Sequence, residues 1–129
     1  MYALAKHLVL ELRDCDRGAL ANLPFLKEVL LRAARDLKVT VLGDSFHHFE
    51  PQGVSGIIFI AESHLSIHTW PEHGYAAVDL FTCGDSIDFE QVAQFLVREL
   101  GARNPTAIEM KRGVVSIDEA TPLEAGQKP

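Results

Sequence analysis

The sequence has few cysteines and no long hydrophobic run. Its two cysteines, Cys15 and Cys83, form no C-x-x-C pair, and free thiols suit a reducing compartment. The longest apolar run, residues 56–61, is far too short to span a bilayer. Charges interrupt the apolar stretch at the N-terminus, which therefore does not resemble a signal peptide. We expect a cytoplasmic protein with no membrane partner.

The chain also has no excess of positive charge. The chain carries 12 basic and 18 acidic residues, and its formal net charge is −6 with a pI near 5.4. A surface that neutralises phosphates needs clustered lysine and arginine, so we expect no nucleic-acid partner. The length of 129 residues and the hydrophobic fraction of 47% fit a single domain, residues 1–129, with a core of its own.

Two segments have the apolar spacing of amphipathic helices. Residues 22–38 carry apolar side chains at helical spacing, and Pro24 falls in the first turn. A second helix is expected after Asp88, which forms a capping-box arrangement with Gln91 three residues later. The buried stripe of this second helix is expected to be Val92, Phe95, Leu96 and Leu100.

The remaining segments have the alternation or the β-branched composition of strands. The expected strands are residues 7–12, 39–49, 54–61, 64–70, 75–83 and a last strand near 107–117. The turns at residues 50–53 and 71–74 have hairpin length and favour antiparallel pairing. This order predicts an α+β fold, a two-layer sandwich with two helices packed on one mostly antiparallel sheet. A polar tail from about residue 118 to 129 is expected to fray.

Residues 61–84 concentrate reactive side chains. Strand alternation places Leu65 and Ile67 on the core face, and the opposite face carries His64, Ser66, His68 and Trp70. A solvated strand face is the simplest interpretation. A metal site that also draws on His47, His48 and His73 is another, but zinc sites bring three or four ligands, and no tight Cys/His spacing is present. We therefore assign no metal.

The order of residues in this stretch supports a third interpretation. The segment AESHLSIHTWPE at residues 61–72, with FEPQGVSG before it and FTCGD after it, closely resembles the prokaryotic S-adenosylmethionine decarboxylases. These pyruvoyl-dependent enzymes are made by self-cleavage of a proenzyme. The resemblance covers nearly the whole chain and is densest between Phe46 and Gly84. It implies a cut between Glu62 and Ser63, which gives a β chain of residues 1–62 and an α chain of residues 63–129.

The resemblance also implies catalytic roles. Ser63 attacks the Glu62 carbonyl to form an ester, and loss of its α-proton then leads to a pyruvoyl group, the cofactor. That ketone forms a Schiff base with the substrate α-amine and accepts electrons as carbon dioxide leaves. His68 corresponds to the group that takes part in the proton removal, and Ser55 corresponds to a residue that assists processing. Cys83 corresponds to the proton donor of the decarboxylation, a role that a thiol can fill.

Three further residues match the family's ligand site. Phe49 and Trp70 are aromatic positions that suit an adenine and a sulfonium cation. Glu72 matches an acid near the ribose hydroxyls, where a carboxylate can accept two hydrogen bonds. The expected partner is S-adenosylmethionine, and the product is the aminopropyl donor for spermidine synthesis. The resemblance and the small domain also predict a homo-oligomer, at least a dimer of αβ protomers with substrate sites at or near the interface.

Several questions stay open at this point. A pyruvoyl-dependent decarboxylase of ornithine or arginine would keep the same cleavage site, and a non-catalytic binding module would keep the residues without the chemistry. Ser63 and His68 are five residues apart, so an ideal strand places them on opposite faces. Joint action requires a bend or bulge near residues 62–63, or a reach across a neighbouring strand. No role is assigned to Cys15, His47, His48, His64 or His73.

Overall fold

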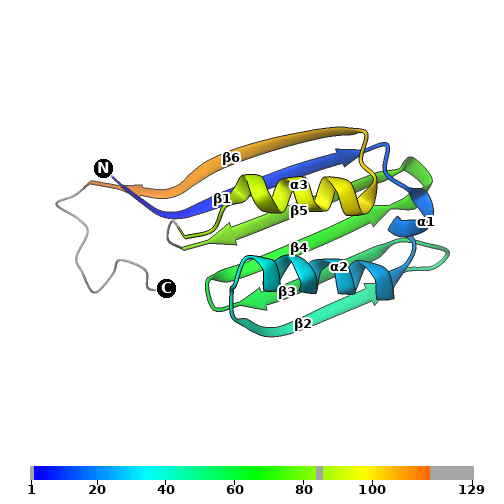
Figure 1. Ribbon diagram of the computed structural model, residues 1–129, viewed down its shortest axis with the longest axis horizontal. Helices are drawn as coiled ribbons and strands as arrows, with labels where there is room; N and C mark the ends of the chain where they lie inside the picture. Colours follow the sequence, from blue (N-terminus) through cyan, green and yellow to red (C-terminus); the bar gives the residue numbers. More distant parts are fainter. Residues whose placement is uncertain (1, 84–85, 117–129) are drawn as a thin grey trace.

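The computed structural model describes residues 2–83 and 86–116 and forms one six-stranded sheet with helices on one of its faces (Figure 1). Its elements in chain order are β1 (Tyr2–Arg13), α1 (Arg17–Leu20), α2 (Leu23–Asp36), β2 (Val41–His48), β3 (Val54–Ile60), β4 (Ser63–Trp70), the 3-10 turn η1 (Pro71–His73), β5 (Tyr75–Thr82), α3 (Phe89–Leu100) and β6 (Asn104–Val115). The predicted polar tail at residues 118–129 lies outside the described residues.

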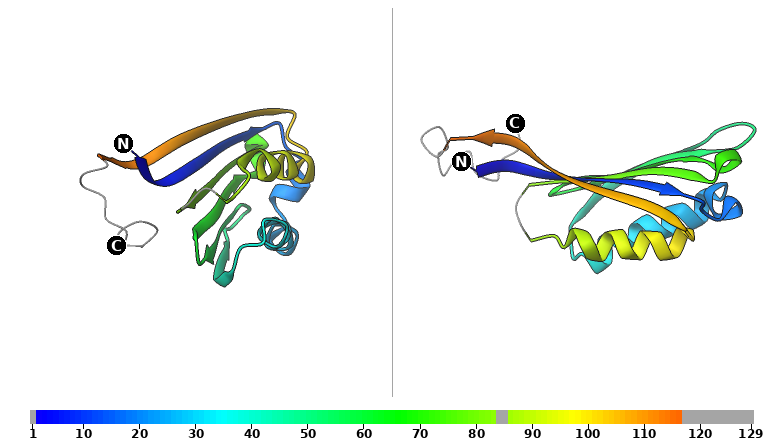
Figure 2. Two further views of the ribbon diagram at one scale, coloured as in Figure 1. Left: turned by 60° about the vertical axis from the view of Figure 1, so that its left-hand side comes forward. Right: turned by 90° about the horizontal axis from the view of Figure 1, so that it is seen from above.

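The strands lie in the order β2-β3-β4-β5-β1-β6, and every neighbouring pair is antiparallel. Figure 2 shows α2 and α3 side by side beneath the sheet, which makes a two-layer structure. The predicted α+β sandwich is therefore confirmed. We call the sheet face away from α2 and α3 the open face.

Local sequence explains where the helices start. Asp88 accepts a hydrogen bond from the Gln91 amide at 3.1 Å, as the capping pattern predicted. The Asn22 side chain caps α2 in the same way and accepts a hydrogen bond from the Phe25 amide at 3.0 Å. The short helix α1 was not predicted, although Asp16 caps it in the same way. Gly101 ends α3 in the left-handed conformation, with a φ of 66°.

The core lies between the sheet and the two long helices. Leu8, Leu10 and Leu12 of β1 are each at most 2% exposed, and Leu65 and Ile67 of β4 are buried in the same core, as alternation predicted. From the helices, the core receives Leu26, Val29, Leu30, Ala33, Val92, Phe95, Leu96 and Leu100. The alternate residues of each strand point to the open face. No helix of the described residues packs against them, so polar and charged side chains are tolerated there.

Strand β6 begins earlier than the sequence predicted. The expected start was residue 107, whereas the strand starts at Asn104 and includes Pro105 opposite Leu12. Proline lacks an amide hydrogen and is tolerated in an edge strand, and β6 is the outermost strand beside β1. The proline therefore marks an edge position and does not end the strand.

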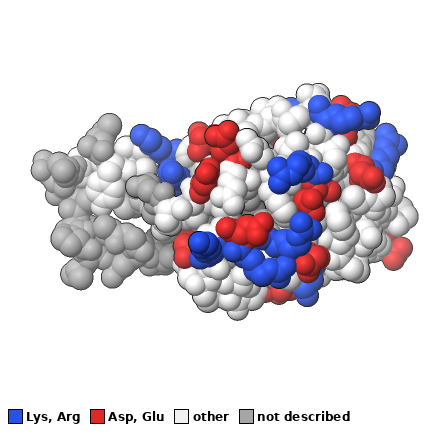
Figure 3. Space-filling model, in the orientation of Figure 1, with Lys and Arg blue, Asp and Glu red and all other residues white. Residues whose placement is uncertain are grey.

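The helix-bearing side of the molecule carries charges of both signs. Figure 3 shows basic and acidic side chains interspersed on this side. Ion pairs join Arg32 to Glu99 at 2.7 Å within the helical layer, and Lys27 of α2 to Asp44 of β2 at 3.4 Å. Within residues 2–83 and 86–116, no helix has the length and apolar character needed to cross a membrane.

Candidate active site

The residues expected to act in cleavage and binding lie at two opposite ends of the sheet. Strand β4 runs from Ser63 at one end to Trp70 at the other (Figure 1). The first end, which we call the cleavage end, holds Glu62, Ser63 and Cys83. The second end, which we call the histidine end, holds Phe49, Ser55, His68, Trp70 and Glu72.

At the cleavage end, backbone geometry and a backbone hydrogen bond fix the position of the predicted scissile bond between Glu62 and Ser63. Ser63 has a φ of 155°, a conformation that residues other than glycine rarely adopt, and the residue is only 8% exposed. The backbone amide of Cys83 donates a hydrogen bond of 3.0 Å to the carbonyl oxygen of Glu62. A donor aimed at this oxygen polarises the carbonyl and favours negative charge on it during attack by a hydroxyl.

At the histidine end, side chains make the contacts. The Ser55 hydroxyl lies 2.8 Å from Nδ1 of His68, and the two residues are direct partners in the β3–β4 register. Both project from the open face. The Trp70 ring stacks on Tyr75, and the Phe49 ring meets that of His47 edge-on with centroids 4.5 Å apart. Ser55 and His68, each expected to take part in processing, are therefore in contact within one chain, a pairing that the sequence did not predict.

A hollow on the open face surrounds this pair. It encloses about 360 Å³ over strands β2, β3 and β4. Its lining consists of Ser45, His47, Ser55, Gly56, Ile57, His64, Ser66 and His68. Among residues 2–83 and 86–116, no group of three or more His, Cys, Asp or Glu side chains is placed to hold a metal ion. The residues that line the hollow include three histidines and three serines, whose imidazoles and hydroxyls can accept and donate protons.

One chain does not bring the two ends together. Strand β4 pairs with β3 and β5 in unbroken register over its length, so it contains no bulge between Ser63 and His68. Five residues of strand span about 16 Å. Neither the expected bend nor a reach across a neighbouring strand places His68 beside Ser63. If both residues act on one bond, a second copy of the chain must supply one of them.

Comparison with known proteins places the chain in a family. The sequence model described as S-adenosylmethionine decarboxylase matches residues 6–113. The chain belongs to the S-adenosylmethionine decarboxylase family. It is 47% identical over 116 residues to the S-adenosylmethionine decarboxylase proenzyme of Thermodesulfovibrio yellowstonii, which covers 90% of this chain and 86% of that protein.

Further relatives match over a larger share of the chain. The S-adenosylmethionine decarboxylase proenzyme of Acidithiobacillus ferrooxidans is 44% identical over 129 residues, which cover 100% of this chain and 97% of that protein. The crystal structure of the adenosylmethionine decarboxylase from Aquifex aeolicus superposes with a TM-score of 0.84 at 29% identity and covers 94% of this chain and 100% of that one. The fold and the family therefore agree.

The structure of this decarboxylase-family chain also contains a cluster that the sequence did not reveal. Asp79, on the open face of β5, accepts hydrogen bonds from Nε2 of His7 at 2.6 Å, from Nε2 of His64 at 3.0 Å and from the Ser66 hydroxyl. Arg112 donates to Nδ1 of His7 at 2.9 Å. Because arginine only donates, Nδ1 of His7 must accept, so its proton is on Nε2 and points at Asp79.

The environment of Asp79 sets its charge. Burial alone would raise the pKa of this carboxyl, but hydrogen bonds from Ser66, His7 and His64, with the attraction of His64, outweigh burial and lower the pKa below its ordinary value. Asp79 is therefore ionised at neutral pH. The only sequence signal was an acid within the otherwise apolar strand YAAVDLFT; its partners lie up to 72 residues away.

The two cysteines have different surroundings. Cys15 is buried, its thiol lies 3.4 Å from the Leu12 carbonyl oxygen, and burial with the nearby charge of Asp14 raises the pKa of Cys15 to about 11. Such a thiol is inert, which agrees with the absence of Cys15 from the predicted site. Cys83 is only partly buried and follows the end of β5 directly.

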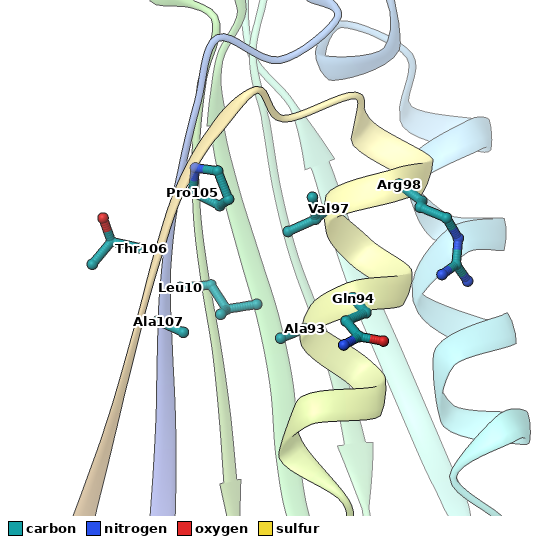
Figure 4. A pocket seen from close by; sticks show the side chains of 8 residues that line it. All are labelled: Leu10, Ala93, Gln94, Val97, Arg98, Pro105, Thr106 and Ala107. Carbon is teal, nitrogen blue, oxygen red and sulfur yellow. The ribbon is translucent and has the colours of Figure 1, made fainter.

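A larger hollow lies elsewhere in the protein. This groove of about 440 Å³ lies between α3 and the edge strand β6. Figure 4 shows Leu10, Ala93 and Val97 pointing toward one another there. Its lining is mostly apolar and contains none of the predicted site residues. The smaller polar hollow, with its hydroxyl and imidazole groups, is therefore the better candidate for the chemistry.

Proposed function

We propose that this protein is a pyruvoyl-dependent S-adenosylmethionine decarboxylase that processes itself between Glu62 and Ser63. The observation that carries the proposal is the hydrogen bond from the Cys83 amide to the Glu62 carbonyl, next to a serine with an unusual backbone conformation. Family membership supplies the substrate, because the curated relatives are named for S-adenosylmethionine. The cytoplasm is the proposed location, since the two free cysteines suit a reducing compartment.

Self-cleavage consumes one water molecule and no other reagent. The Ser63 hydroxyl loses its proton and attacks the Glu62 carbonyl carbon, while the Cys83 amide stabilises the oxyanion. The Glu62–Ser63 carbon–nitrogen bond breaks, the amine nitrogen takes up a proton, and an ester remains. Removal of the Ser63 α-proton then expels the Glu62 carboxylate and leaves a dehydroalanine. This residue tautomerises, and water replaces its nitrogen as ammonia, which produces the pyruvoyl group.

The residues present fit a pyruvoyl group at position 63. Ser63 is the first residue of β4, an inner strand of the sheet, so the new chain end stays paired with β3 and β5. The pyruvoyl group supplies an electron sink for the pair of electrons left when carbon dioxide departs. Cys83 follows Thr82, which lies opposite Ser63 in the register, so its thiol is the nearest predicted acid to return a proton to the substrate carbon.

We further propose that two copies form the complete site. The Ser55 and His68 pair lies about 16 Å along β4 from Ser63 of the same chain. An isologous dimer that places the histidine end of one copy against the cleavage end of the other completes two equal sites. In this arrangement His68 assists proton removal at the partner's Ser63, and Phe49, Trp70 and Glu72 bind the substrate at the partner's pyruvoyl.

The open face has the composition of such an interface. Polar groups occupy its centre, while Phe59, Ile108 and Met110 are 40–47% exposed on the same face. Large apolar side chains exposed on one face favour a surface that another protein covers. Because the open face carries both the Ser55–His68 pair and these apolar residues, it is the proposed contact between the two copies.

The test of this function has two parts. Intact-mass analysis should find two chains, residues 1–62 and a blocked chain of residues 63–129, with Ser63→Ala as the uncut control. Release of carbon dioxide is then measured with S-adenosylmethionine, ornithine and arginine. Turnover of ornithine or arginine alone would replace the substrate assignment, and an uncut chain would favour a non-catalytic binding module. The family match gives no support to either alternative.

A further inference from the structure

Two stacked aromatic rings close the β4–β5 hairpin at the histidine end. Trp70 and Tyr75 are direct partners in the register, their ring centroids are 5.4 Å apart, and their planes differ by 29°. Trp70 remains 43% exposed. Tyr75 therefore supports the indole from one side, while a large part of the indole stays accessible to a ligand.

Tyr75 is itself held in place by a neighbouring strand. Its hydroxyl donates a hydrogen bond of 2.6 Å to Oε1 of Glu11 on β1. Glu11 lies opposite Ala77 in the register, two residues along β5 from Tyr75. Burial, the hydrogen bond to Glu11 and the Glu11 charge raise the pKa of Tyr75 to about 12, although Arg13 acts in the opposite direction. The phenol thus remains a donor over the whole physiological range.

This supported indole is a neighbour of the candidate catalytic pair. Trp70 follows His68 by two residues on β4, so both side chains leave the sheet on the open face. His68 lies 2.8 Å from Ser55. The series of side-chain contacts from Glu11 to Tyr75 and from Tyr75 to Trp70 therefore ends beside the hollow that Ser55 and His68 line.

We propose that Tyr75 is a positioning residue that holds Trp70 as a fixed aromatic surface for substrate binding. This inference rests on the proposed function, which makes Trp70 a substrate contact. A nucleoside sulfonium offers a flat ring that stacks on indole and a positive charge that an indole face attracts. A ring that is already immobile loses less conformational entropy when the substrate binds. The contribution of Tyr75 is therefore to affinity and not to the rate of the chemical step.

Two measurements on purified, self-processed protein test this role. Trp70 is the sole tryptophan of the chain, so fluorescence excited at a wavelength that tyrosine does not absorb reports on Trp70 alone. Tyr75→Leu removes the stacked ring, and Tyr75→Phe keeps the ring but loses the Glu11 hydrogen bond. Tyr2→Leu, the same change at the only other tyrosine, is the matched control at the far end of β1.

We expect a split between KM and kcat. Tyr75→Leu should raise KM for S-adenosylmethionine about three- to tenfold, as expected for loss of one aromatic pair, and change kcat less than about twofold. The Trp70 fluorescence anisotropy should fall, and acrylamide should quench the indole more strongly. Tyr75→Phe should restore most of both properties, and Tyr2→Leu should leave both at the parent values.

Other outcomes overturn the inference. Unchanged KM and anisotropy in Tyr75→Leu would show that Trp70 needs no support, and a fall in kcat at constant KM would assign Tyr75 to the chemistry. If Tyr75→Leu does not fold, Tyr75→Met is judged by the same two criteria. If the parent protein does not decarboxylate S-adenosylmethionine, the proposed function fails, while anisotropy and quenching still decide whether Tyr75 immobilises Trp70.

Discussion

The two ends of the sheet place their functional groups by different means. At the cleavage end the backbone does so, through the positive φ of Ser63 and the Cys83 amide on the Glu62 carbonyl. At the histidine end side chains do so, through the Ser55–His68 contact and the Trp70–Tyr75 stack. A backbone amide survives almost any substitution of its residue, whereas a side-chain contact does not. The same kind of mutation should therefore affect cleavage differently at each end.

The largest effect on self-cleavage should come from inactivating one end of the sheet in one copy and the other end in a second copy. Ser63→Ala and His68→Ala should each leave the protein without mature enzyme, the first uncut and the second stalled at the ester. A hybrid of the two variants contains one site with both Ser63 and His68 intact. Co-expression with different tags should therefore restore cutting, and the fragments should come from the His68→Ala chain alone.

This complementation also has a clear negative result. If hybrids form, as shown by capture of one tag with the other, but no chain is cut, the two-copy site is wrong. Normal cleavage of His68→Ala on its own would instead remove His68 from processing.

A change at Cys83 should separate cleavage from catalysis. Cys83→Ala keeps the backbone amide that donates to Glu62, so at least part of the chain should still be cut. Turnover per pyruvoyl should fall about a hundred- to ten-thousandfold, the usual contribution of a positioned general acid. Cys83→Pro removes the amide hydrogen and should block cutting. The cut fraction on a gel beside the turnover rate measures both, and a parent rate in Cys83→Ala would exclude the thiol as the acid.

A smaller effect concerns the packing behind Ser55. A Cβ added at Gly56 would lie 2.1 Å from the Phe46 ring, so the ring must move. Gly56→Ala should lower the free energy of unfolding by about 1–3 kcal/mol. The matched control is Gly43→Ala, because nothing lies within 4 Å of its added Cβ. Urea unfolding of both variants in a Ser63→Ala background measures the difference, and equal stabilities would contradict the packing argument.

The smallest effect should come from Asp79, which lies between the two ends. Its pKa is lower in the folded state than in the unfolded chain, so its contribution to stability is present above the unfolded pKa and is lost as pH falls through the folded value. Asp79→Asn should therefore be less stable at pH 7 and lose less stability on acidification. Thermal unfolding from pH 7 to pH 3 tests this, with Asp36→Asn at an exposed position as the control. Parallel pH profiles would refute the assignment.

Much of the fold followed from local patterns. Alternation identified the core face of β1 and β4, and the capping residue Asp88 marked the start of α3. Motif order supplied the candidate residues at both ends, and their roles stay predictions. Nothing local indicated that Ser63 and His68 lie at opposite ends of an unbroken strand pairing, that the Cys83 amide faces Glu62, or that His7 meets Asp79, since each depends on the register between strands.

The strand order has a consequence for the proposed cut between Glu62 and Ser63. Residues 1–62 supply β1, β2 and β3, and residues 63–129 supply β4, β5 and β6, yet β1 lies between β5 and β6. The two fragments are interleaved, with three strand pairings across the division and one shared core. The proposed cut between Glu62 and Ser63 would leave these three pairings and the shared core in place. It would therefore free a new chain end at residue 63 without releasing either fragment.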